Sequence, residues 1–227
     1  MRLSERLSPN HNARPGGRAP DLVVLHYTGM RSAAEALERL CDPAAQVSAH
    51  YLIEEDGRVW HLVPEERRAW HAGLSCWQGE RDVNGLSVGI ELVNPGHEFG
   101  YRAFPPAQME ALATLLDRVV RRCGIPPRRI VGHADVAPAR KQDPGELFDW
   151  AALAADGFGL WTEAVLEDRG ERFEALGYDP KVAPEDVIRA FQRHWRPARV
   201  DGLRDPETGG RLAALLQAAG PDFRRPG

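Results

Sequence analysis

One loop of the sequence concentrates residues that could do chemistry. The stretch GHADVAPARKQDPG, residues 132–145, carries His133, Lys141 and Asp143 directly after a short apolar run. A solvated turn needs none of these side chains in particular. A metal site needs at least the histidine and one aspartate, together with a partner from elsewhere in the chain. The loop is therefore a candidate metal-binding or catalytic segment.

Two further polar side chains lie on apolar segments that are typical of strands. His26 ends the run in DLVVLHYTG, and Glu91 lies within GLSVGIELVN, where apolar residues alternate with others. In α/β sheets, functional sites gather where strands end and loops begin. Despite their distance in the sequence, His26, Glu91, His133 and Asp143 could therefore converge.

Two imidazoles and one carboxylate, here His26, His133 and Asp143, form a common catalytic zinc set that leaves a fourth position open for water. Zinc would lower the pKa of that water to about 7 and polarise a bound carbonyl. Glu91 would then act as general base and proton shuttle, and Lys141 would stabilise the developing oxyanion. From spacing alone the evidence for a metal site is weak, because there is no HExxH motif and a strand-end histidine is more often structural. Glu91 could simply face solvent or pair with an arginine.

Composition limits the class of protein. A length of 227 residues suits one full domain with a small second one, and 43% hydrophobic residues are enough for a core. The formal net charge of −4 gives no basic face for nucleic acid and no polybasic membrane tail. The three cysteines, without a repeated CxxC, argue against a disulfide framework or a cysteine zinc site.

Targeting signals are not evident in the sequence. The first residues, MRLSERLSPNHNARPGG, contain no apolar core of a secretory signal. No window approaches the ~18 apolar residues of a membrane span. We therefore expect a cytoplasmic protein, with export by an unrecognised route left open.

The order of expected elements indicates an α/β fold with a mixed central sheet flanked by helices. Residues 8–20, rich in Pro, Gly, Asn and Arg, are expected to form an irregular arm. Strands are expected at 22–25, at 85–94 and at 130–131, with a hairpin over 48–63. Helices are expected at 33–42, capped by Ser32, at 105–123, ending at Gly124, and at 147–157.

The pattern changes after Gly157. Residues 160 to about 220 are expected to form three short helices, a module near the lower size limit for independent folding. The predicted domains are thus an N-terminal arm at 1–19, a catalytic domain at 20–157 and a small all-α domain at 158–222.

Several segments resemble the zinc-dependent N-acetylmuramoyl-L-alanine amidases of type 2: HYTG, SAHYLIEEDGRVWHLVPEERRAWHAG, SVGIELVNPG and GHADVAPARKQDPG. They occur in the family's order over about residues 20–152. The family shares its fold with phage lysozyme-type amidases and peptidoglycan recognition proteins. The resemblance implies hydrolysis of the amide between N-acetylmuramic acid, or its 1,6-anhydro form, and L-alanine of the stem peptide. It also implies Zn²⁺ as cofactor, and peptidoglycan or an anhydro-muropeptide as substrate.

The resemblance assigns roles residue by residue. His26, His133 and Asp143 match the zinc ligands, Glu91 matches the catalytic glutamate, and Lys141 matches the lysine near the scissile carbonyl.

Other residues of the matching segments are candidates for substrate binding: His50, Trp70, His71, Asn94 and Arg140. His50 and His71 are expected near the cleft, as substrate contacts or as groups that orient the ligands. A buried structural role for these two histidines is an equal alternative. Asn94 and Arg140 are expected to bind oxygens of the stem peptide or the lactyl group.

The C-terminal segment resembles the three-helix peptidoglycan-binding domain often joined to such amidases, through LGYDP, AFQRHWRP, VDG and DPETGGRL. Phe191 and Trp195, at helical spacing, are expected in its core rather than on a ligand platform. The module could hold wall polymer or pack beside the cleft. Asp135 is expected to support the loop of residues 132–145, called the metal loop below, and not to be a ligand.

The main alternative is a recognition protein of the same fold that binds muropeptide without cutting it. Non-catalytic relatives typically lack a zinc ligand, so the complete set favours an enzyme. Two biological roles stay open: cytosolic recycling of anhydro-muropeptides and remodelling of intact peptidoglycan. The sequence predicts no oligomeric state.

Overall fold

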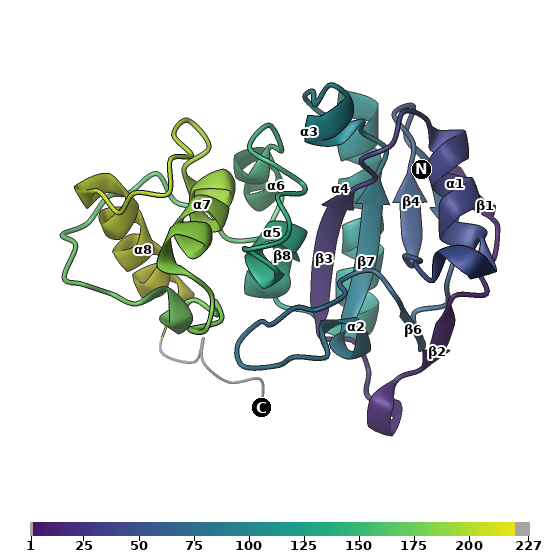
Figure 1. The fold of residues 1–227 in the computed structure, drawn as a ribbon, viewed down its shortest axis with the longest axis horizontal. Coiled ribbons are helices and arrows are strands. Elements are labelled where there is room, and N and C mark those ends of the chain that lie inside the picture. Colours follow the sequence, from purple (N-terminus) through teal and green to yellow (C-terminus); the bar gives the residue numbers. More distant parts are fainter. Residues whose placement is uncertain (1, 221–227) are drawn as a thin grey trace.

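The computed structural model, which describes residues 2–220, has a six-stranded mixed sheet at its centre (Figure 1). The strand order is β1-β5-β4-β7-β3-β8. Its strands are β1 (Arg2–Glu5), β3 (Leu22–Tyr27), β4 (Tyr51–Ile53), β5 (Arg58–His61), β7 (Ser87–Leu92) and β8 (Ile130–Gly132). Only the β4–β5 hairpin is antiparallel within this sheet. The mixed α/β fold predicted from the sequence is confirmed.

The register of the central parallel strands brings distant residues together. His26 at the end of β3 lies opposite Glu91 of β7, and Leu25 lies opposite Gly132 of β8. His133, the residue after Gly132, therefore lies beside the carboxyl end of β3. Parallel neighbours end at the same edge of a sheet, so the polar ends of β3, β7 and β8 share one location.

One face of the sheet is covered by α4 (Pro106–Cys123), which lies behind the sheet in Figure 1. Its apolar side packs against Val23, Leu25 and Ile90. The helix ends at Gly124, which has the left-handed φ of 68° that a terminating glycine accommodates without strain. This end is as predicted.

The opposite face carries two groups of helices with a gap between them. At one side, α1 (Ala33–Cys41), capped by the Ser32 side chain, packs on Leu52 of β4. At the other side, α5 (His133–Val136) packs on β3, and α7 (Pro184–Trp195) packs on α5, in a cluster that includes Leu22 and Val24. His26 and Leu52 face this same side, because alternate residues of a strand share a face and both pair with Glu91.

The remaining described elements are short, apart from the C-terminal helix. They are α2 (Val83–Leu86), α3 (Gly96–Phe99), α6 (Trp150–Ala155), α8 (Pro206–Ala219), the two-stranded sheet of β2 (His11–Ala13) with β6 (Arg67–Ala69), and the 3₁₀ turns Pro15–Gly17, Pro43–Ala45, Pro127–Arg129 and Phe173–Ala175.

The prediction of an irregular N-terminal arm is wrong in part. β1 adds a parallel strand at the edge of the main sheet, and β2 pairs with β6. Arg14 is only 4% exposed, and its guanidinium donates to the backbone oxygens of Glu65, Gly85 and Ser87. These partners lie elsewhere in the chain, so the sequence of the arm alone could not predict that the arm is ordered.

The prediction of three C-terminal helices is also wrong. The described chain has α7, α8 and the single turn Phe173–Ala175 there, while residues 160–172 form neither helix nor strand. Val165 and Leu166 are 48% and 42% exposed, so this segment buries no apolar face against the core as a packed helix would. Instead it runs across α8, where Leu166 N–H donates to the Gly210 oxygen; a side chain at Gly210 would collide with the Leu166 backbone. The predicted domain boundaries stay a prediction.

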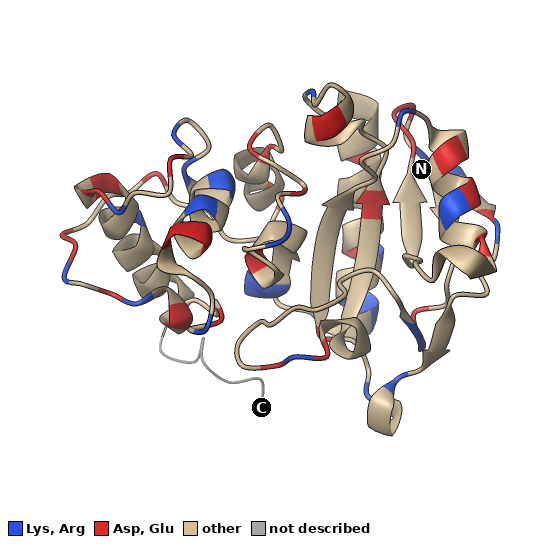
Figure 2. Cartoon of the chain, viewed as in Figure 1, with Lys and Arg blue, Asp and Glu red and all other residues tan. Residues whose placement is uncertain are grey.

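Acidic and basic residues are interspersed along the helices and loops in the view of Figure 2. Among residues 2–220, no helix has both the length and the apolar character needed to cross a lipid bilayer.

Candidate metal centre and active site

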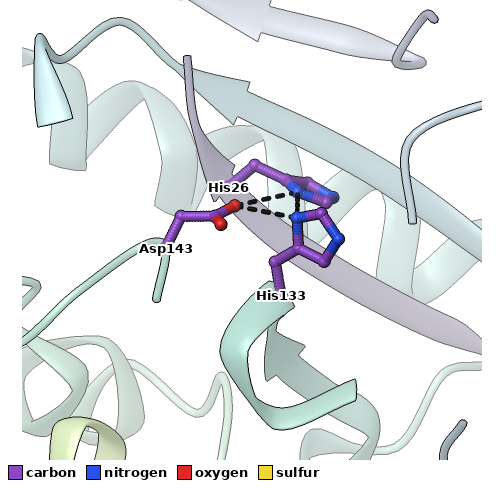
Figure 3. Close-up of side chains that lie close together, drawn as sticks. All are labelled: His26, His133 and Asp143. Carbon is purple, nitrogen blue, oxygen red and sulfur yellow. Dashed lines mark hydrogen bonds and ion pairs between the residues drawn. The ribbon is translucent and has the colours of Figure 1, made fainter. Parts of the chain in front are cut away.

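Three predicted ligands meet at the edge of the sheet (Figure 3). The Nδ1 atoms of His26 and His133 are 2.9 Å apart, and they lie 3.1 Å and 3.0 Å from Oδ2 of Asp143. All three residues are buried. β3 supplies His26, the first turn of α5 supplies His133, and the following loop supplies Asp143. Ala134 N–H donates to the Asp143 backbone oxygen, which closes the loop and brings its two ligands together.

This donor set fits a divalent metal ion. Two imidazole nitrogens and one carboxylate oxygen, all within 4.8 Å of one another, can face one ion. Burial, and then His133, lower the pKa of His26 to about 4, which favours the neutral imidazole that a metal requires. Burial alone would raise the pKa of Asp143, but His133 and His26 outweigh it and hold that pKa well below its usual range. The carboxyl is therefore ionised and ready to act as a ligand.

The outer nitrogens of both histidines are also held. His133 Nε2 lies 3.1 Å from the Ala72 backbone oxygen, an obligatory acceptor. His26 Nε2 lies 3.0 Å from His71 Nδ1, and His71 Nε2 lies 3.1 Å from the Ser87 hydroxyl. If Nδ1 of His26 binds the ion, its Nε2 carries the proton and donates to His71. His71 then donates to Ser87, whose hydroxyl donates to the Val83 backbone oxygen.

Two small features place His71 behind His26. A side chain at Gly89 of β7 would lie 2.4 Å from the His71 ring, so only glycine leaves room for the ring against the strand. Asn84 Oδ1 accepts from the backbone N–H groups of His71 and Ala72. The Asn84 amide thus fixes residues 71–72, which supply the His71 ring to His26 and the Ala72 oxygen to His133. Sequence reasoning gave no role to Asn84 or Ser87, and no local pattern distinguishes them.

Glu91 and Lys141 line the same cavity as the candidate ligands His133 and Asp143. Glu91 Oε2 is enclosed and has no hydrogen-bond partner among the described residues. Burial, and then the charge of Asp143, raise the pKa of Glu91 well above its usual range. Such a carboxyl exchanges protons more readily near neutral pH than an ordinary glutamate does. An unpartnered, proton-exchanging group beside a metal site has the character of a general acid–base residue.

The cavity has a volume of about 550 Å³ and lies in the gap between α1 and the metal loop. Ala36, Arg39 and Leu40 of α1 form one wall, and residues 140–143 form another. The sequence did not single out these α1 residues, because a helix face gives no local signal of what lies opposite.

The residues predicted to bind substrate divide into two groups. Trp70, His71 and Arg140 line the cavity. Arg140 also donates to the backbone oxygens of Ala72 and Leu74. His71 is buried and holds His26, which fits its expected role in orienting a ligand.

His50 and Asn94 do not line the cavity, so the structure does not support their prediction as direct substrate contacts. His50 is fully buried, with Nδ1 accepting from Gly89 N–H and Nε2 near the Arg67 oxygen. His50 therefore has the buried structural role that the sequence left open as an alternative to substrate binding. Asn94 is buried in a turn, where its side chain bonds Gly96 N–H and the Arg102 oxygen.

Comparison with known proteins gives one consistent result. The family model for N-acetylmuramoyl-L-alanine amidase matches residues 16–146. The N-acetylmuramoyl-L-alanine amidase AmiD of Escherichia coli (strain K12) is 38% identical over 234 residues, which cover 88% of this chain and 84% of that protein. The 1,6-anhydro-N-acetylmuramyl-L-alanine amidase AmpD of Citrobacter freundii is 35% identical over 165 residues, which cover 65% of this chain and 86% of that protein.

A solved structure extends the match to nearly the whole fold. It is the complex of E. coli AmiD with the substrate anhydro-N-acetylmuramic acid-L-Ala-D-gamma-Glu-L-Lys. It superposes with a TM-score of 0.80 and 37% identity, covering 93% of this chain and 94% of that one. These matches show that the chain belongs to the N-acetylmuramoyl-L-alanine amidase family, and the candidate ligand set and Glu91 lie within the matched residues.

Proposed function

We propose that this chain is a zinc-dependent amidase that hydrolyses the bond between the lactyl carbonyl of N-acetylmuramic acid, or its 1,6-anhydro form, and the nitrogen of L-alanine. The observation that carries the proposal is the cluster of His26, His133 and Asp143 at one cavity, whose lining includes His133 and Asp143 together with Glu91 and Lys141. A recognition protein that only binds muropeptide needs no enclosed carboxylate beside the ligand set, so Glu91 favours the enzyme.

The metal is proposed to be Zn²⁺, held by His26 Nδ1, His133 Nδ1 and an Asp143 oxygen. Two imidazoles and one carboxylate are a frequent protein contribution to catalytic zinc sites. When bound, zinc would polarise the scissile carbonyl and lower the pKa of a water molecule. The buried ligands and their fixed outer nitrogens supply the orientation that such a site requires.

Glu91 is the proposed proton carrier. It accepts a proton from the attacking water as the water oxygen bonds to the lactyl carbonyl carbon. It then gives that proton to the alanine nitrogen as the carbon–nitrogen bond breaks. The products are a lactyl carboxylate and a peptide with a free L-alanine amino group. The raised pKa of Glu91 suits the second transfer, since a weaker acid holds the proton until the amine can take it.

Lys141 is proposed to stabilise negative charge on the carbonyl oxygen, and Lys141→Ala tests this role. We expect kcat to fall by about 10²–10³, the typical cost of removing one such donor. Zinc content should be unchanged, because Lys141 is not among the candidate ligands. The matched control is Lys181→Ala, which removes the chain's other lysine, an exposed one. Equal rates in the two variants would remove Lys141 from the mechanism.

The overall function is tested by mass spectrometry of one digest. Purified protein would meet an anhydro-muramyl tripeptide and intact sacculi, each with and without a chelator. We expect release of peptides that begin with L-alanine, loss of this release on chelation and its return with added zinc. The faster substrate would separate recycling of muropeptides from remodelling of the wall.

Binding of both substrates without release of any peptide would contradict the enzyme and favour the recognition protein. Release that persists in chelator would contradict the metal. Cytoplasmic location and wall binding by the C-terminal module stay predictions; cell fractionation tests the first, and sedimentation of the protein with purified sacculi tests the second.

A further inference from the structure

A buried polar cluster joins the C-terminal helices to the metal loop. Asp135, two residues after the ligand His133, is 1% exposed. Its Oδ1 accepts from the Tyr178 hydroxyl at 2.7 Å, and its Oδ2 lies 2.7 Å from His194 Nδ1. A carboxylate only accepts hydrogen bonds, so Nδ1 of His194 carries the proton and donates. Both donors come from residues 173–219, which we call the C-terminal helical unit.

The same carboxylate holds the backbone of the metal loop. Asp135 Oδ2 also accepts from Gly132 N–H at 2.7 Å, which fixes the start of α5, where His133 is the first residue. Gly132 in turn lies against Pro144, which directly follows the ligand Asp143; a Cβ at Gly132 would be 2.8 Å from Pro144. The cluster therefore contacts Gly132, the residue before the ligand His133, and Gly132 lies against Pro144, the residue after the ligand Asp143.

The two donors are held in place by their surroundings. The His194 ring is stacked between Trp150 and Trp195, with centroid distances of 3.7 Å and 3.6 Å. Burial, and then the charge of Asp135, raise the pKa of Tyr178 well above its usual range, so its hydroxyl keeps its proton. Buried hydrogen bonds to a carboxylate are short and strong and restrict its position.

We propose that the C-terminal helical unit is a structural part of the metal centre, in which His194 and Tyr178 act as positioning residues for His133 through Asp135. This inference rests on the proposed zinc site. Residues that hold metal ligands in place typically change metal affinity when they are replaced. Phe191 and Trp195 of the same unit are 0% and 2% exposed, so they belong to the shared core and offer no open platform to a wall polymer.

The test uses the full chain and three substitutions in the cluster. His194→Phe keeps a flat ring between the two tryptophans but removes the hydrogen bond to Asp135. His194→Asn restores a donor close to the position of Nδ1, and Tyr178→Phe removes only the hydroxyl. Phe191→Leu is the matched control, because it disturbs the buried core of the same helix without touching Asp135.

Zinc affinity is measured by competition with a chromogenic chelator. The visible spectrum of the cobalt-substituted protein reports the geometry of the metal ligands. The Tm of each variant reports its folding stability. We expect His194→Phe to weaken zinc binding about 10-fold and to alter the cobalt spectrum. Tyr178→Phe should act in the same direction and His194→Asn should recover most of the affinity. Phe191→Leu should lower Tm and leave zinc affinity and the spectrum unchanged.

The inference is overturned if His194→Phe and Tyr178→Phe bind zinc as tightly as the unaltered chain. It is also overturned if Phe191→Leu loses as much affinity as His194→Phe, because the effect would then be one of general stability. Failure of the proposed function looks different: the unaltered chain itself would bind no zinc, or would bind it and release no peptide.

Discussion

Asp143→Ala is expected to abolish amidase activity, with zinc affinity falling by more than about 100-fold, beyond the usual cost of losing a residue that merely supports a ligand. Asp143 Oδ2 is the atom that both ligand histidines face. His133 and His26 hold the pKa of Asp143 well below its usual range, against the opposing effect of burial. The carboxyl is therefore charged at neutral pH, and the substitution removes a charged ligand. Chelator competition measures the affinity, and peptide release from an anhydro-muramyl tripeptide measures the rate.

The control is Asp149→Ala, a nearby exposed aspartate that caps α6 through Ala152 N–H. Its loss should cost about 1 kcal/mol of stability, as for other helix caps, and leave zinc binding intact. An Asp143→Ala protein that hydrolysed substrate as fast as its parent would show that the metal assignment is wrong.

Glu91→Gln is expected to lower kcat by about 10²–10⁴, the range that general acid–base groups contribute, while zinc affinity is retained. The amide has nearly the same shape as the carboxyl but cannot carry the proton from water to the leaving nitrogen. Because Glu91 Oε2 forms no hydrogen bond within the described residues, the substitution breaks no internal contact of that atom. Steady-state release of L-alanine peptides, with zinc content measured on the same sample, checks both parts.

Glu110→Gln is the matched control, since it makes the same chemical change at an exposed position of α4, on the opposite face of the sheet. It should have the parental rate. Full activity in Glu91→Gln would mean that another group moves the proton. Loss of zinc together with activity would instead make Glu91 a part of the metal site.

The sequence by itself determined the elements that have a local cause. The buried run of β3, the alternation in β7, the Ser32 cap of α1 and the glycine that ends α4 all follow from neighbouring residues. The ligand set was proposed from residue type and position at strand ends, and it gained weight through the resemblance of several ordered segments to one family. The ligands meet where that reasoning expected them to meet, because parallel strands end at a common edge.

Only the tertiary structure decided what depends on residues far apart in the chain. The register that places His26 beside Glu91 is a property of strand pairing and not of either strand. Burial of Arg14 and the strands of the N-terminal arm depend on partners beyond residue 57. His50 and Asn94 have the same residue types as functional groups, and only their buried contacts distinguish them from such groups. The sequence assigned no role to His194, because its partner Asp135 is 59 residues away in the chain and meets it only in the folded structure.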